Sequence, residues 1–136
     1  MRFDWDQKYE IGNELIDKEH QVFVELIRNV AYSIEDDAES DYIVRLLTEV
    51  EKYAEFHFLS EENIMISCRY PERERHRQLH LQLSRRLRDH IEAYQRGESE
   101  AVAVLEFLMD WFAQHTVRED LRLAEHIGRL NAHGSA

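Results

Sequence analysis

Two pairs of potential metal ligands, each four residues apart, constrain the fold of this chain most strongly. The first pair is His57 and Glu61, and the second is His76 and His80. Residues four apart lie on the same face of an α-helix, so each pair can present two ligands from one helical stripe. An antiparallel hairpin centred on Cys68-Arg69 would place His57 level with His80. The same hairpin would place Glu61 level with His76.

Two further histidines are placed at this level when the midpoint between paired residues is taken as the position of a turn. The midpoint of His20 and His57 falls in the acidic stretch 36–41, and the midpoint of His80 and His115 falls at Gly97-Glu98. Both stretches are typical of turns, so three turns bring the ligand-type residues to one height. The sequence therefore predicts an all-α fold, an up-down-up-down four-helix bundle with a metal site inside.

The apolar spacing divides the chain into an arm, a bundle and a tail. Residues 1–17 lack helical periodicity and are expected to form an N-terminal arm, with Asp17 as the N-cap of the first helix. Helices are expected over about 18–36 and 41–66, then from a first turn containing Pro71 to about Tyr94, and then from near Glu98. A short C-terminal helical segment follows, around 121–127. The bundle is expected to span 18–130 of a single domain, 1–136, with a frayed tail over 131–136.

Composition agrees with a helical protein and excludes several partners. Apolar residues make up 43% of the 136, and only 4 Gly and 1 Pro interrupt them, which favours long helices over a sheet. The net charge of -11 argues against nucleic acid and anionic membranes as partners. A single cysteine, Cys68, suggests a reducing compartment. No apolar leader or membrane span is recognisable, so a cytoplasmic location is expected.

Seven residues are expected to meet at one level of the bundle. A single histidine on an apolar stripe is more often a hydrogen-bonded core residue than a ligand. Five histidines and two carboxylates together would leave many buried polar groups unsatisfied, at about 1–3 kcal/mol each, unless they bind metal. Seven ligands exceed the four of a structural zinc site but suit two ions bridged by carboxylates. The candidate metal ligands are His20, His57, Glu61, His76, His80, His115 and Asp120.

The spacing of these seven residues resembles that of the hemerythrin family, in its bacterial branch. Smaller similarities, from Phe3 to about Ile127, include Ile16-Asp17-Lys18-Glu19-His20, His57-Phe58, Glu61-Glu62, Tyr70-Pro71 and Trp111-Phe112-Ala113-Gln114-His115. The resemblance implies two iron ions, one held by His76, His80 and His115 and the other by His20 and His57. It also implies that Glu61 and Asp120 bridge the irons together with an oxo or hydroxo group. The two-histidine iron would keep an open position, where O2 binds.

Three functional classes fit such a centre. The first is reversible O2 binding at a non-heme di-iron site, for oxygen storage, delivery or sensing. The second is a di-iron oxidase, peroxidase or NO-handling enzyme, and the third is an iron-responsive interaction domain. No histidine follows a glutamate by three residues, as in the Glu-x-x-His motifs of di-iron carboxylate bundles. The histidine-rich set favours binding over catalysis, so the chain is not expected to be an enzyme, although it could be a domain of a longer receptor or cyclase.

The level next to the metals is expected to form the O2 pocket. The inward residues predicted there are Phe23, Tyr53, Leu83 and Trp111, a mostly apolar set without an acid to deliver protons.

The helix near the last two ligands is expected to depart from regular α geometry. His115 and Asp120 are five apart, about 140° around an α-helix, so a π-type turn or a break is expected between them. Cys68 and the histidines outside the pattern, His90, His126 and His133, are expected to be ordinary loop, boundary or surface residues.

Overall fold

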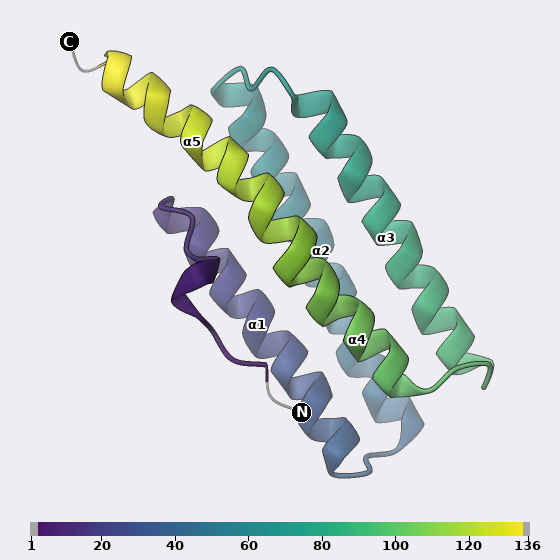
Figure 1. Ribbon diagram of the computed structural model, residues 1–136. Helices are drawn as coiled ribbons and strands as arrows, with labels where there is room; N and C mark the ends of the chain where they lie inside the picture. Colours follow the sequence, from purple (N-terminus) through teal and green to yellow (C-terminus); the bar gives the residue numbers. More distant parts are fainter. Residues whose placement is uncertain (1–2, 135–136) are drawn as a thin grey trace.

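Four antiparallel helical rods make up the fold in the computed structural model, which describes residues 3–134, with side chains described over 3–132 (Figure 1). The elements are η1 (Gln7–Tyr9), α1 (Glu14–Glu35), α2 (Ser40–Ser67), α3 (Arg73–Gln95), α4 (Ala101–Trp111), η2 (Phe112–Thr116) and α5 (Val117–Gly134). The segment η2 is π-helical and joins α4 and α5 into one continuous rod. The predicted all-α bundle is confirmed. None of the described helices is both long and apolar enough to cross a membrane.

Short turns fix the antiparallel order of the rods. The turn between α1 and α2 uses Asp37 at φ 52°, and the turn after α2 uses Arg69 at φ 53°. The predicted turn at Gly97 is confirmed: Gly97 adopts φ 74°, a left-handed conformation that glycine enters without steric cost. In the resulting bundle, α2 packs against α1 and α3, and α4 packs against the same two helices.

The first helix begins earlier than the sequence predicted. It starts at Glu14, and its N-cap is Asn13, whose side chain accepts a hydrogen bond from the Ile16 N–H. Asp17 is therefore not the N-cap. Its carboxylate instead accepts hydrogen bonds from the backbone N–H groups of Ile11 and Gly12, at 2.9 and 3.2 Å. An acidic side chain in the first helical turn also interacts favourably with the helix dipole. Because α1 begins at Glu14, the arm ends at Asn13 rather than at residue 17.

Other boundaries also differ from the prediction. Pro71 lies in the turn before α3, which begins two residues later at Arg73. The fourth rod begins at Ala101 rather than near Glu98. Its last part is a helix of 18 residues rather than a short separate segment, and it continues to Gly134. The positions 131–134 expected in the tail are thus helical, and positions 135–136 lie outside the described residues.

Two apolar clusters enclose one polar level of the bundle. The larger cluster includes Phe23, Leu47 and Phe112, and the smaller one contains Ile16, Met65 and Leu123 at the end near Cys68. On α1, α2 and the α4–α5 rod, the candidate ligands lie between the residues of these clusters in the sequence. The level between the clusters is therefore shielded from water at both ends.

The N-terminal arm covers the π-helical segment. Phe3 and Tyr9 each meet the Phe112 ring edge to face, with ring centroids 5.7 and 5.2 Å away. Phe112 in turn contacts the ring of His20 at 5.3 Å. The arm runs alongside α1 in Figure 1. Its aromatic residues thus pack on the bundle and close one side of the polar level.

Candidate metal centre

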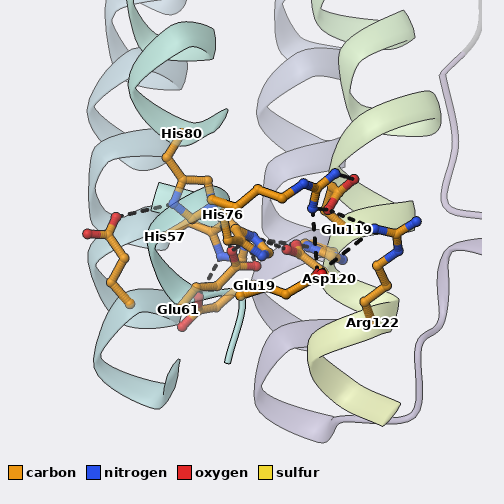
Figure 2. Close-up of polar contacts among 12 residues, drawn as sticks. Glu19, His57, Glu61, His76, His80, Glu119, Asp120 and Arg122 are labelled. Carbon is orange, nitrogen blue, oxygen red and sulfur yellow. Dashed lines mark hydrogen bonds and ion pairs between the residues drawn. The ribbon is translucent and has the colours of Figure 1, made fainter. Parts of the chain in front are cut away.

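Six of the seven predicted ligands meet in the interior of the bundle. All of them except His20 are labelled in Figure 2. Each is at most 5% exposed. Their ligand atoms form two groups, and within each group these atoms lie within 4.8 Å of one another. We call these six residues the donor cluster: His20, His57, Glu61, His76, His80 and Asp120.

Four helices supply the donor cluster. His20 comes from α1, the pair four apart on α2 supplies His57 and Glu61, and Asp120 comes from α5. The pair His76 and His80 comes from α3. One group contains His20 and His57, the other contains His76 and His80, and both groups contain Glu61 and Asp120. The two groups therefore share their carboxylates, as two neighbouring metal positions would.

Glu61 stands between the histidines of α2 and α3. Its carboxylate oxygens lie 3.0 Å from Nε2 of His57, 3.0 Å from Nε2 of His80 and 3.3 Å from Nε2 of His76. Four residues of the donor cluster thus face one another across a few ångströms, from two helices joined by a tight turn.

Asp120 makes the corresponding link from α5. Its Oδ2 accepts a 2.7 Å hydrogen bond from Nε2 of His20, and its Oδ1 lies 3.2 Å from Nε2 of His76. Each of its two oxygens therefore faces a different donor group, which is the arrangement expected of a bridging carboxylate.

The protein alone does not satisfy the hydrogen-bonding capacity of this level. Nε2 of His57 and both carboxylate oxygens of Glu61 are buried without a hydrogen-bond partner, although Nε2 of His57 and an oxygen of Glu61 lie 3.0 Å apart. Buried unpaired polar atoms are rare in native proteins because each costs free energy. Imidazole nitrogens and carboxylate oxygens that point inward in this way fit the coordination preferences of iron and similar ions.

Electrostatics tie the cluster together in the absence of metal. Burial alone would lower the pKa of His76, but short polar contacts and charge interactions with Asp120 and Glu61 outweigh it and raise that pKa to about 10. Burial opposes ionisation of Glu61 as well, yet the nearby His57 and short polar contacts within the cluster hold the pKa of Glu61 well below its usual value. Metal ions must therefore displace protons from these imidazoles when they bind.

The structure does not bring His115 into either donor group. This side chain is exposed, and it lines a cavity of about 230 Å³ that His76, His80 and Asp120 also line. The predicted departure from α geometry is present, with the Val117 N–H donating to the Phe112 carbonyl five residues earlier. However, the π segment covers 112–116, mostly before His115 rather than between His115 and Asp120. His115 and Asp120 thus line the same cavity, but only Asp120 belongs to the donor groups.

Three of the four predicted pocket residues form an aromatic layer beside the donor cluster. Phe23 and Trp111 are buried and contact each other at 5.3 Å, and Phe23 also meets the His57 ring at 6.0 Å. Tyr53 is partly buried, and its hydroxyl donates to the Glu19 carbonyl at 2.8 Å. Leu83 is partly buried and lines the cavity near His115.

Several neighbours of the centre were not assigned from the sequence. Phe58 stacks on the His80 ring at 4.0 Å, and Phe112 packs against His20. Glu19 lies 2.7 Å from Nδ1 of His57, and Glu62 lies 3.2 Å from Nδ1 of His80. The sequence signal for the two glutamates was their position directly beside a predicted ligand, His20 or Glu61.

Two of the remaining histidines, His90 and His126, lie outside the donor groups. His90 stacks on Phe107 at 4.5 Å, and Nε2 of His126 hydrogen-bonds to the backbone carbonyl of Cys68 at 3.1 Å. The Cys68 thiol is partly buried and contacts the Met65 carbonyl. The side chain of His133 lies outside the described residues.

Comparisons with known proteins point to the same centre. Residues 11–127 match the model of the Hemerythrin HHE cation binding domain. A bacteriohemerythrin of Clostridium acetobutylicum is 27% identical over 124 residues, which is 87% of this chain and 95% of the relative. A bacteriohemerythrin of Pseudomonas paraeruginosa is 26% identical over 116 residues, covering 85% of this chain and 75% of the relative. One of Stenotrophomonas maltophilia is 23% identical over 123 residues, covering 90% and 80%.

Proposed function

Because this chain belongs to the hemerythrin family, we propose that it binds O2 reversibly at a pair of iron ions, for oxygen storage, delivery or sensing. The observation that carries the proposal is the sharing of Glu61 and Asp120 by two buried donor groups. A single ion would need only one such group. Two groups with common carboxylates suit two ions at bridging distance.

The chain's own residues assign unequal ligand sets to the two positions. His20 and His57 would hold one iron, while His76 and His80 would hold the other. We include His115 as the third histidine of the second position, because it lines the same cavity as His76 and His80. The first position then has fewer protein ligands. When bound, the iron pair supplies the electrons and the open coordination position that O2 requires.

The surroundings of the centre favour release of O2 over its reduction. Phe23 and Trp111 cover the donor cluster with aromatic surface. The Tyr53 hydroxyl, the nearest acidic proton in this layer, already donates to the Glu19 carbonyl, and burial raises its pKa to about 12. A dry site without a ready proton donor slows the protonation steps that turn bound O2 into a leaving product.

Absorption spectra of the iron-loaded protein test this proposal. The reduced protein is prepared without oxygen, exposed to air and then flushed with argon. We expect a visible charge-transfer band in air that disappears under argon and returns over several cycles. Irreversible oxidation with steady consumption of a reductant would instead indicate the runner-up function, a di-iron oxidase, peroxidase or NO-handling enzyme. A zinc-loaded sample, which cannot supply electrons, serves as the control for non-specific spectral changes.

A further inference from the structure

Each donor group contains one histidine whose outer ring nitrogen faces a carboxylate. In the first group, Nδ1 of His57 lies 2.7 Å from Oε1 of Glu19. In the second group, Nδ1 of His80 lies 3.2 Å from Oε2 of Glu62. The other histidine of each group differs, because Nδ1 of His20 and Nδ1 of His76 are buried without a hydrogen-bond partner. In each donor group, therefore, only one of the two imidazoles has a carboxylate in contact with its outer nitrogen.

These contacts fix which nitrogen points to the metal. A carboxylate accepts the Nδ1–H proton, so Nε2 of the same ring keeps its lone pair for the ion. The geometry agrees, since Nε2 of His57 and Nε2 of His80 each lie 3.0 Å from Glu61, at the centre of the cluster. An imidazole that donates to a carboxylate is also a more basic ligand.

Glu19 is held more firmly than Glu62. The Ser60 hydroxyl donates to Oε2 of Glu19 at 2.9 Å, and the Tyr53 hydroxyl donates to the Glu19 backbone carbonyl at 2.8 Å. The side chain of Glu19 is 10% exposed, whereas that of Glu62 is 25% exposed. A shorter contact in a drier environment gives a stronger charge-assisted hydrogen bond. Glu19 lies on α1, next to His20 in the sequence. Its contact with the His57 ring therefore links α1 to α2.

We propose that Glu19 and Glu62 are positioning residues, one for each metal position, and that Glu19 has the larger effect on metal retention. This inference rests on the proposed two-iron site. Neither glutamate binds an ion itself: each orients the histidine in front of it and increases its basicity as a ligand.

Iron release to a chromogenic Fe²⁺ chelator, measured without oxygen, tests the proposal. The variants are Glu19→Gln and Glu62→Gln, which keep the side-chain shape but remove the charge. The matched control is Glu49→Gln, an exposed position on α2. We expect each test variant to release one iron per chain roughly 10- to 100-fold faster than the control, because removing such a partner typically weakens metal affinity by about that factor. The larger change is expected for Glu19→Gln, and Ser60→Ala should give a smaller change in the same direction.

A spectroscopic readout separates positioning from a general effect on folding. In the zinc-loaded protein, the Nδ1–H proton of His57 should give a strongly downfield NMR signal that moves upfield in Glu19→Gln but not in Glu62→Gln. The proposal is overturned if both variants release iron at the rate of the control. It is also overturned if Glu19→Gln speeds release of both irons equally while it lowers the thermal midpoint of the metal-free protein.

The iron content of the wild type keeps this test separate from the proposed function. A wild-type protein with a single iron contradicts the two-iron function. The inference then still requires one of the two Gln variants to speed release of that ion, and it fails if neither does.

Discussion

Replacing Glu61 by alanine should remove both irons at once. The Glu61 carboxylate lies 3.0 Å from Nε2 of both His57 and His80, so it belongs to both donor groups. A terminal ligand serves one ion, whereas a bridging ligand serves two. We therefore expect iron per chain to fall from two to near zero in Glu61→Ala, rather than to one.

The same change should destabilise the metal-free protein. Burial lowers the pKa of His57 and His76, but the carboxylates around them, Glu61 included, outweigh that effect, so both imidazoles carry charge in the buried cluster. Removing one partner of a buried ion pair costs about 3–5 kcal/mol, because it leaves the other charge uncompensated. We expect a loss of this size in the free energy of unfolding, measured with urea after metal removal.

Leu47→Ala is the matched control for that loss of stability. Leu47 is fully buried on α2, ten residues before His57, which is about 15 Å along the helix. A buried Leu→Ala change costs about 2–5 kcal/mol through the cavity that it leaves. We therefore expect a comparable destabilisation with two irons retained.

Two results would refute this reasoning. If Glu61→Ala kept two irons with an unchanged spectrum, the bridging role would be wrong. If Leu47→Ala lost iron to the same extent as Glu61→Ala, metal loss would follow from reduced stability alone and would say nothing about ligation.

Three further predictions concern protons, water and the seventh ligand. The pKa of His76 is about 10 in the folded metal-free protein and about 6.5 when unfolded, so its stabilisation is complete below pH 6.5 and is lost as pH rises through 10. The free energy of unfolding, measured with urea, should therefore fall less between pH 7 and pH 10 in His76→Gln than in the wild type. Leu83→Asp should speed the slow air oxidation of the O2-bound protein markedly by admitting water and a proton donor, whereas Leu83→Met should not, as absorption spectra over hours will show. His115→Ala should bind about one iron per chain by metal analysis, and two retained irons would exclude His115 as a ligand.

The register of the bundle could be predicted because its ligands are periodic. His57 and Glu61 replace apolar residues in a helical stripe, and so do His76 and His80. The midpoints at the three turns therefore aligned the candidate ligands of all four helices at one level, without knowledge of side-chain packing. The structure brings six of the seven candidate ligands to this level.

The start of the first helix depended on local hydrogen bonds that periodicity does not reveal. Asn13 and Asp17 are both good N-cap residue types. Asn13 is the N-cap because the Asp17 carboxylate instead accepts hydrogen bonds from the N–H groups of Ile11 and Gly12, which hold the arm against the helix. Such a contact depends on the path of the arm, and the arm has no regular period.

The ligand environment was only partly predictable for a related reason. The sequence indicated that the helix would deviate near His115, but not that the π segment would lie at 112–116, where the arm residues Phe3 and Tyr9 pack on Phe112. Glu19 was not assigned a role because its partner, His57, is 38 residues away on another helix.

Anomalous diffraction at the iron absorption edge, from crystals of the iron-loaded protein, tests the central claim most directly. We predict two anomalous peaks inside the bundle, one beside His20 and His57 and the other beside His76 and His80, with Glu61 and Asp120 in contact with both. A single peak, or a signal at the zinc edge without one at the iron edge, would contradict the two-iron centre.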